Sequence, residues 1–199
     1  PGVPPADVAI LGGGIVGQNA ARTFLGLGAN VYLLDNSLAT LQSIDREFKG
    51  CVHTLVSYPF NIEKVCSYAD ILIGAILVPG APTPVIVTRD MVKKLHSRSI
   101  IIDLSIDQGG CFETSRPTSH SNPTYVEEDV IHYCVPNMTG VLGRTATHAL
   151  NNAAWPLIKQ IAKQGIDSAL RENKALQRGV YTHQGEIVKD QLNQALKGR

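Results

Sequence analysis

The chain of 199 residues is long enough for one substantial hydrophobic core, or for one domain with an appendage. Its 44% hydrophobic and 18% charged residues exclude an intrinsically disordered chain. The formal net charge of +1, with no polybasic run, gives no electrostatic reason to expect a nucleic-acid partner or an anionic membrane surface. No apolar run approaches the ~20 residues of a transmembrane helix.

The N-terminal end of the sequence is typical of a linker that runs into a strand. Residues 1–5 lack the charged start and the apolar centre of a signal peptide, and there is no initiator methionine. We therefore expect further sequence upstream of Pro1.

Short apolar segments alternate with segments of helical spacing as far as residue 135. Buried strands are expected at 7–11, 30–34, 51–57, 71–76, 99–104 and 130–135. Helices are expected at 15–27, 38–48, 62–68 and 88–95, with Asn61 and Thr88 as N-caps of the last two. This alternation predicts an α/β fold with a doubly wound parallel sheet, in which right-handed crossovers place helices on both faces.

The pattern changes after residue 140. Helices are expected at about 145–164, 167–178 and 186–197, joined by a turn-rich link at 179–185. Pro156 should kink or interrupt the first of these helices. The sequence thus predicts a sheet domain over 1–140 and a helical C-terminal segment over 141–199, whose apolar faces need a partner.

The four cysteines form no metal-binding or disulfide pattern. Cys51, Cys66, Cys111 and Cys134 contain no CxxC pair, so we expect four buried free thiols in a cytoplasmic protein. His132 and Cys134 could lie on one face of a strand, but no other potential ligand groups with them. No metal site is expected.

A glycine-rich motif follows the first expected strand. Gly12, Gly14 and Gly17 occupy the three glycine positions of G-x-G-x-x-G, and the motif opens an expected helix. In this context the motif predicts a dinucleotide site. Gly12 permits the tight turn, Gly14 lets the backbone approach a pyrophosphate, and Gly17 lets helix and strand pack closely. The N-terminus of the helix presents free N–H groups and the positive end of its dipole to the phosphates.

An acidic residue ends the second expected strand. Asp35 lies 23 residues after Gly12, close to the spacing at which such sites place a carboxylate on the adenosine ribose. The same carboxylate would repel a 2′-phosphate, so the sequence favours NAD over NADP.

Four stretches carry a resemblance to a known family, and the third of them is far more specific than the glycine motif. They are residues 9–14 (AILGGG), 73–81 (IGAILVPGA), 106–118 (IDQGGCFETSRPT) and 135–138 (VPNM). With these stretches the chain resembles the alanine dehydrogenases, whose fold the proton-translocating transhydrogenases share. The form IDQGGCF is typical of the dehydrogenases. The resemblance covers essentially the whole chain, most strongly residues 4–140.

The resemblance implies a Rossmann fold, NAD as the cofactor, and a set of cofactor-binding residues. Besides the glycines, this set has Ile15 and Val16 at the pyrophosphate loop, Asp35 at the adenine ribose and Ser57 at the adenine end. Ile76 and Leu77 are expected to cover the cofactor, and Arg116 also belongs to the set. The residues expected around the nicotinamide are Leu104, Ser105, Ile106, Asp107, Val135, Pro136, Asn137 and Met138. Thr40 stands where the family often has a basic residue, so one adenosine contact of the family does not carry over.

Asp107 corresponds to the family's active-site aspartate. It follows a buried strand at the C-terminal edge of the expected sheet, where ligands bind in this fold. A carboxylate there can assist proton transfer as L-alanine becomes iminopyruvate and then pyruvate. The alternative interpretation of Asp107 is a structural one, in which its side chain caps the turn at 108–110. His120 is interpreted as a solvated loop residue rather than an acid–base group. Arg144 is interpreted as a surface or interface residue rather than a partner of the substrate carboxylate, and Cys111 as a packing residue.

The resemblance also implies an activity. It is the NAD-dependent oxidative deamination of L-alanine to pyruvate and ammonia, and the reverse, with this chain as the cofactor-binding half. In the family the substrate-holding lysine and histidine lie in a domain before the linker, the C-terminal helices return to that domain, and the full-length protein is a homo-oligomer, often a hexamer. Two alternatives are an NAD(H)-binding component of a proton-translocating transhydrogenase and a non-catalytic NAD-binding module.

Overall fold

A computed structural model describes residues 2–189 of the chain. The chain divides into two compact units, Pro1–Met138 and Thr139–Arg199.

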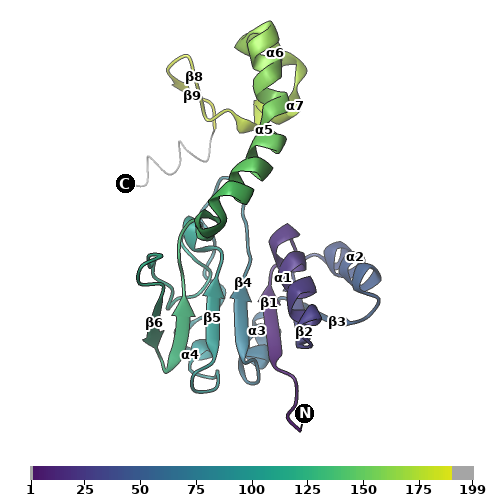
Figure 1. The fold of residues 1–199 in the computed structure, drawn as a ribbon, viewed down its shortest axis with the longest axis vertical. Helices are drawn as coiled ribbons and strands as arrows, with labels where there is room; N and C mark the ends of the chain where they lie inside the picture. Colours follow the sequence, from purple (N-terminus) through teal and green to yellow (C-terminus); the bar gives the residue numbers. More distant parts are fainter. Residues whose placement is uncertain (1, 190–199) are drawn as a thin grey trace. The chain divides into compact units, whose positions relative to one another are not determined.

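The N-terminal unit is built on a seven-stranded sheet (Figure 1). Its strands are β1 (Asp7–Leu11), β2 (Asn30–Asp35), β3 (Val52–Val56), β4 (Ile71–Gly74), β5 (Ile100–Asp103), β6 (Thr124–Glu127) and β7 (Val130–Tyr133). The order is β3-β2-β1-β4-β5-β7-β6, and every pairing is parallel except β6 with β7. The predicted α/β fold with a doubly wound parallel sheet is confirmed, with one antiparallel edge strand added.

Helices cover both faces of this sheet, as expected for alternating strands and helices (Figure 1). They are α1 (Ile15–Gly26), α2 (Leu38–Phe48), α3 (Pro59–Cys66) and α4 (Arg89–Val92). Buried residues of α1 and α2 share one hydrophobic cluster with β1 and β2, while α3 and α4 contribute to a second cluster. Each central strand is therefore apolar on both sides, which is why its sequence shows an unbroken apolar run.

The order of the strands determines where a ligand can bind. The chain moves outward from β1 through β2 to β3, then returns to place β4 on the other side of β1. The loops after β1 and β4 consequently leave the sheet in opposite directions at the carboxyl ends of these strands. A crevice is expected at such a switch point.

Several predicted details of this unit are wrong. Asn61 does not cap a helix: α3 begins at Pro59, three residues before the predicted start, and its N-cap is Tyr58. The Asn61 side-chain amide donates instead to the carbonyl oxygen of Val56 (2.8 Å). Thr88 does cap α4, accepting from the N–H of Met91 at 3.3 Å. The last predicted strand stops at Tyr133 rather than at residue 135.

The C-terminal unit is mainly helical. The chain continues through a 3₁₀ turn, η2 (Met138–Leu142), into α5 (Gly143–Gln164), α6 (Ile166–Glu172) and α7 (Lys174–Gly179). Pro156 lies inside α5 without interrupting it, whereas the helix predicted at 167–178 divides at Asn173, whose side chain caps α7. The prediction of a helix from 186 is wrong, because β8 (Thr182–His183) and β9 (Glu186–Ile187) form a hairpin. Residues 188 and 189 are not helical either, and residues 190–197 of that prediction lie outside the described residues.

Apolar side chains of α5 are exposed within the described part of the chain. None of its residues is buried, and Leu150, Trp155 and Ile158 are exposed. No helix within residues 2–189 has the length and apolar character needed to cross a bilayer. The prediction that these helices pack on another domain stays a prediction.

The cysteines of residues 2–189 are all free. Cys66, Cys111 and Cys134 are buried as predicted, but Cys51 is exposed, because it lies in the turn that precedes β3. No group of three or more potential metal ligands occurs among the described residues.

A buried histidine lies on β7, between the sheet and the loop that follows Phe112. His132 is completely buried; its Nδ1 lies 3.0 Å from the Val130 carbonyl oxygen, and its Nε2 lies 2.8 Å from the hydroxyl of Thr114. This pairing fits a neutral ring that donates from Nδ1 and accepts at Nε2. Burial lowers the pKa of His132 below its ordinary value.

We therefore expect stability to fall as the pH falls through the range in which an unfolded histidine titrates. Below about pH 6.5 the unfolded chain gains a proton that folded His132 resists, so unfolding takes up a proton. The loss approaches ~1.4 kcal/mol per pH unit at most. Urea unfolding at pH 7.5, 6.5 and 5.5 measures it. His132→Gln should flatten the dependence, and His96→Gln, at an exposed site, should not. Equal slopes in both variants would contradict the assignment.

Candidate functional site

The glycine loop after β1 packs directly against backbone at two positions. Gly12 has a φ of +108°, and a Cβ there would lie 2.5 Å from the carbonyl oxygen of Ala75. A Cβ on Gly17 would collide with the carbonyl oxygen of Gly12. These contacts give Gly12 and Gly17 the turn and packing roles that the motif predicts.

Gly14 has open space instead. Nothing lies within 4 Å of a Cβ built on it, and it is the N-cap residue of α1. No side chain caps this end of the helix, and the first turn contains no acidic residue. The N–H groups and the positive end of the helix dipole can therefore act on an anion there.

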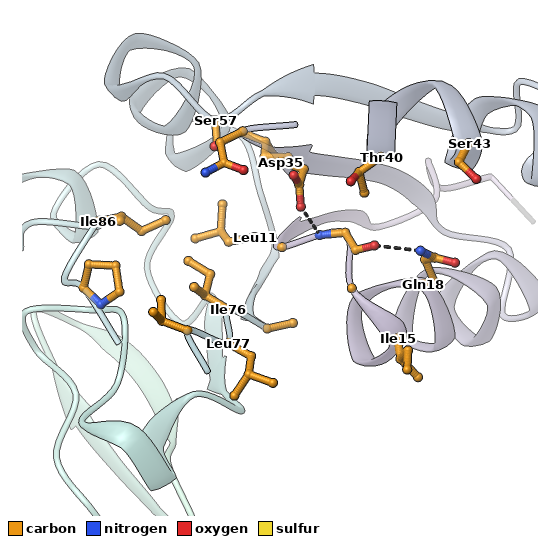
Figure 2. A pocket seen from close by; sticks show the side chains of 18 of the residues that line it. Leu11, Ile15, Gln18, Asp35, Thr40, Ser43, Ser57, Ile76, Leu77 and Ile86 are labelled. Carbon is orange, nitrogen blue, oxygen red and sulfur yellow. Dashed lines mark hydrogen bonds between the residues drawn. The ribbon is translucent and has the colours of Figure 1, made fainter. Parts of the chain in front are cut away.

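The middle glycine is held by two side chains that the motif does not include. The N–H of Gly13 donates to Oδ2 of Asp35 (2.8 Å), and its carbonyl accepts from Nε2 of Gln18 (2.7 Å), as Figure 2 shows. The other oxygen of Asp35 accepts from the N–H of Ser37 (2.8 Å). Sequence analysis missed Gly13 and Gln18, since neither position is specified by the G-x-G-x-x-G pattern.

A cavity of about 840 Å³ opens beside this loop. It is lined by Leu11, Gly12, Gly13, Gly14, Ile15, Gln18, Leu34, Asp35, Asn36, Ala39, Thr40, Ser43, Ser57, Ala75, Ile76, Leu77, Val78, Pro84 and Ile86. Figure 2 shows Asp35 and the glycine loop on one side of it and Ile76, Leu77 and Ile86 on the other. None of the lining residues is cationic, and Asp35 is the one carboxylate among them.

Part of the predicted cofactor set lines this cavity. Those residues are Gly12, Gly14, Ile15, Asp35, Ser57, Ile76 and Leu77. Gly17 is buried behind the loop, and Val16 is exposed on α1 outside the lining.

The residues predicted around the nicotinamide follow β5 and β7. The hydroxyl of Ser105 accepts from the N–H of Ile76 (3.0 Å), which joins this region to the cavity. Asp107 is exposed in the short 3₁₀ helix η1 (Ile106–Gln108), and its Oδ1 accepts from the N–H of Asn137 (2.9 Å). The structure therefore joins Asp107 to Asn137, 30 residues further along the chain.

The other predicted residues of this region differ in exposure. Val135 and Ile106 are buried, whereas Leu104, Pro136 and Met138 are partly exposed. Arg116 lies elsewhere: its guanidinium is 3.9 Å from the ring centroid of Tyr125, and it is not among the lining residues. Its contact with a cofactor stays a prediction.

Three other polar residues were considered from the sequence. His120 and Arg144 are exposed, as interpreted. Cys111 is completely buried, and burial, together with the nearby Asp103, raises the pKa of its thiol. A thiol of this kind packs and does not act as a nucleophile at neutral pH.

Sequence analysis missed a buried carboxylate at the end of β5. Asp103 is completely buried and accepts hydrogen bonds from the N–H of Ser105 (2.9 Å), the N–H of Cys111 (3.0 Å) and the hydroxyl of Ser115 (2.6 Å). Burial raises the pKa of Asp103, and these donors oppose the rise. An acid at the end of an apolar run was the available signal.

A protein-family model described as alanine dehydrogenase/PNT, C-terminal domain, matches residues 1–190. The chain belongs to this family. It is 46% identical over 188 residues to an alanine dehydrogenase of Halomonas elongata, covering 94% of this chain and 51% of that relative. It is also 46% identical over 198 residues to alanine dehydrogenase 2 of Staphylococcus aureus, covering 99% and 53%. The chain thus spans about half the length of the curated relatives it matches.

Solved structures agree with the family assignment. A structure of an L-alanine dehydrogenase matches with a TM-score of 0.88 at 42% identity, covering 99% of this chain and 54% of that one. The transhydrogenase of Sinorhizobium meliloti matches with a TM-score of 0.73 at 22% identity, covering 94% and 50%. The second likeness shows the shared fold alone.

The contact at Gly17 generates a stability prediction. Alanine in place of glycine inside a helix ordinarily stabilises a protein by about 1 kcal/mol. Gly17→Ala should instead lower the free energy of unfolding by about 1–3 kcal/mol, because its methyl group would push α1 away from the loop. Gly26→Ala, in the same helix with nothing within 4 Å, is the matched control and should not destabilise. Urea unfolding of both variants measures the difference, and a stabilised Gly17→Ala would refute the close packing.

Proposed function

We propose that this chain binds NAD(H) and forms the cofactor-binding half of an enzyme that oxidatively deaminates L-alanine to pyruvate and ammonia, and catalyses the reverse. The observation that carries the proposal is the orientation of Asp35. Two backbone N–H groups hold its carboxylate at the edge of a cavity without cationic lining residues. Membership of the alanine dehydrogenase/PNT family and the 46% identity to alanine dehydrogenases support the proposed activity.

The cavity has the features that an NAD molecule needs. The open space at Gly14, in front of the uncapped end of α1, suits the pyrophosphate. The two oxygens of Asp35 each keep a lone pair for the hydroxyls of the adenosine ribose. Ser57 lines the same cavity, and we propose that it contacts the adenine end. Apolar side chains of Ile76, Leu77 and Ile86 face these groups and can cover the cofactor.

The basic residue that the family often has on α2 is replaced by Thr40, which lines the cavity. A threonine hydroxyl can donate one hydrogen bond but supplies no charge. This side of the cavity therefore offers no cation to a 2′-phosphate, and Asp35 repels it. We propose NAD, and not NADP, on this ground.

We place the nicotinamide beside Leu104–Asp107 and Val135–Met138. NAD, when bound, accepts the hydride from the α-carbon of alanine. The exposed carboxylate of Asp107 would take up a proton as the amino acid becomes iminopyruvate and water adds to give pyruvate. The N–H of Asn137 holds one oxygen of that carboxylate, which leaves the other oxygen for the proton.

NADH should bind at least about tenfold more tightly than NADPH, a difference of about 1.4 kcal/mol. The reason is the like charge of Asp35 and the 2′-phosphate. Asp35→Ala should weaken NADH binding and reduce the preference. Calorimetric titration of both cofactors measures the ratio. Asp45→Ala, at an exposed position on α2, is the control and should keep it. Equal affinities in the unchanged chain would contradict the proposal.

Residues 1–199 by themselves should bind NADH without oxidising alanine. A carboxylate substrate needs a fixed cationic partner, and the lining residues of the cavity provide none. The resemblance assigns that partner to a preceding domain. Absorbance at 340 nm in the presence of NAD and L-alanine measures turnover, and calorimetry confirms that NADH is bound.

Turnover of the ordinary order, about 1–1000 per second, would show that the chain holds its own substrate site. Hydride transfer from NADH to an NADP analogue without an amino acid would favour the transhydrogenase alternative. Binding in the absence of either reaction, also within a longer form of the protein, would favour a non-catalytic module.

The remaining partners are proposed on the resemblance alone. We propose that the complete protein is a homo-oligomer, with a hexamer as the family's common form. A cytoplasmic location also stays a proposal, supported by the free thiols of the described residues.

A further inference from the structure

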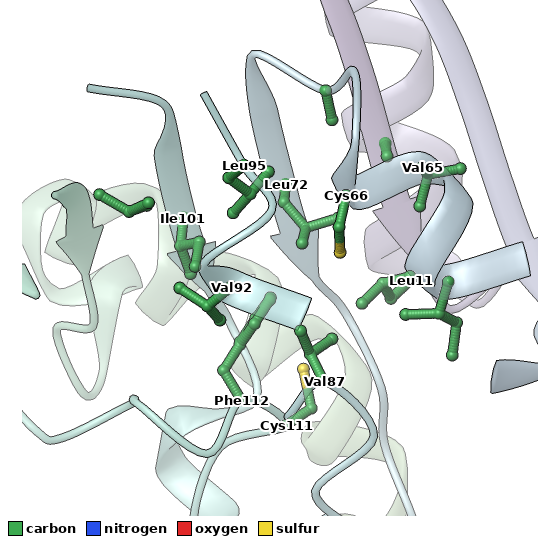
Figure 3. Close-up of a cluster of buried hydrophobic side chains, with 14 of the residues drawn as sticks. Leu11, Val65, Cys66, Leu72, Val87, Val92, Leu95, Ile101, Cys111 and Phe112 are labelled. Carbon is green, nitrogen blue, oxygen red and sulfur yellow. The ribbon is translucent and has the colours of Figure 1, made fainter. Parts of the chain in front are cut away.

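Asp103 is a fully buried acid at the point where β5 ends. It pairs in register with Gly74 of β4, and a Cβ on that glycine would lie 3.0 Å from its Oδ1. The neighbouring Cys111 and Phe112 belong to the hydrophobic cluster shown in Figure 3. Burying a carboxyl group against an apolar core is costly unless donors surround it.

Both oxygens of Asp103 are occupied by donors that cannot be reversed. Oδ1 accepts from the N–H of Ser105, and Oδ2 accepts from the N–H of Cys111. A backbone N–H can only donate. The hydroxyl of Ser115 adds a third bond, to Oδ2.

These bonds close the segment 104–110 at both ends. The Asp103 carboxylate holds Ser105, the second residue of the segment, and Cys111, the residue directly after the segment. Gly110 makes the closure possible: it has a φ of +82°, and a Cβ there would lie 2.6 Å from Oδ2 of Asp103. The segment is therefore fixed from inside the protein, although Asp107 within it is exposed.

The segment in turn contacts two other loops at the carboxyl edge of the sheet. Ser105 accepts from the N–H of Ile76, which lines the cavity after β4. Asp107 accepts from the N–H of Asn137, after β7. One buried carboxylate thereby connects the three loops among which we place the nicotinamide.

We propose that Asp103 is a positioning residue for the nicotinamide end of the site. It fixes the segment 104–110, and through that segment it sets Ile76 and Asp107, without touching the cofactor itself. The proposal rests on the proposed NAD(H) binding. Replacing a residue that merely supports the core would weaken binding of all parts of the cofactor equally. Replacing a positioning residue would weaken binding of the nicotinamide and leave binding of the adenosine and pyrophosphate unchanged.

Asp103→Asn separates these two roles. In either orientation of the amide, its NH₂ group faces the N–H of Ser105 or of Cys111, so one buried bond is replaced by a repulsive contact. We expect NADH affinity to fall about tenfold or more, which corresponds to one buried hydrogen bond, while affinity for ADP-ribose, which lacks the nicotinamide, changes less than about threefold. Calorimetry gives both affinities, and NADH fluorescence reports the nicotinamide environment separately.

Hydrogen exchange followed by mass spectrometry gives a second readout. Exchange should rise in peptides covering 104–116 and at Asn137, and should stay unchanged over 12–35. Asp45→Asn makes the same chemical change at an exposed position on α2 and should alter neither readout. If Asp103→Asn does not fold, Ser115→Ala decides the question: it removes one donor to Oδ2, keeps both backbone bonds, and should give a smaller loss confined to NADH.

The outcomes distinguish this proposal from the proposed function. If the unchanged chain binds neither NADH nor ADP-ribose, the proposed function fails and takes this inference with it. If it binds both equally well, the function stands but there is no nicotinamide contribution for Asp103 to organise, and the inference is overturned. Equal losses of both ligands in the variant, or no loss of either, overturn it as well.

Discussion

The close approach between α1 and the loop after β1 is the constraint on which the site depends. Gly17 packs directly on the carbonyl of Gly12, and Gly12 packs on the carbonyl of Ala75 after β4. No residue larger than glycine fits at either contact without displacing backbone. The helix axis, the loop and the end of β4 are thus fixed together, and the N-terminus of α1 is aimed at one side of the cavity.

Within this arrangement the polar groups act mainly through fixed orientation. Gly13 lies between Asp35 and Gln18, so neither of the two peptide groups that flank it can rotate without losing a hydrogen bond. A site of this kind can recognise a pyrophosphate without lysine or arginine, because oriented N–H groups and a helix dipole supply the positive potential. This agrees with a chain whose net charge is only +1.

The sequence predicted most of the sheet because central parallel strands have an unmistakable signature. The apolar runs at 7–11 and 30–34 correspond to β1 and β2, and the turn and packing glycines follow from a motif with a mechanical reason for each position. The strand at Thr124–Glu127 was missed, because an edge strand with polar residues has no such run. The prediction of Asn61 as an N-cap was wrong because a side-chain amide can donate a hydrogen bond to a preceding carbonyl oxygen as readily as it caps a helix.

The candidate site was predicted less completely. The resemblance grouped Asp107 and Asn137 around the nicotinamide, but only the three-dimensional arrangement shows the hydrogen bond between them. The hairpin at 182–187 was not predicted, because strands of two residues each give too short a pattern to detect. Buried polar groups such as Asp103 are the hardest to predict, because their partners are backbone N–H groups, which almost every residue type has.

The neighbourhood of Asp103 also has a consequence for how such a sequence can diverge. A side chain at Gly74 would collide with Cys111 and crowd Phe112, and one at Gly110 would strike the carboxylate. Replacing the acid alone would leave two inward-pointing N–H groups without an acceptor. Single substitutions are therefore penalised at each position, and an evolutionary path away from this arrangement has to change several of these residues together.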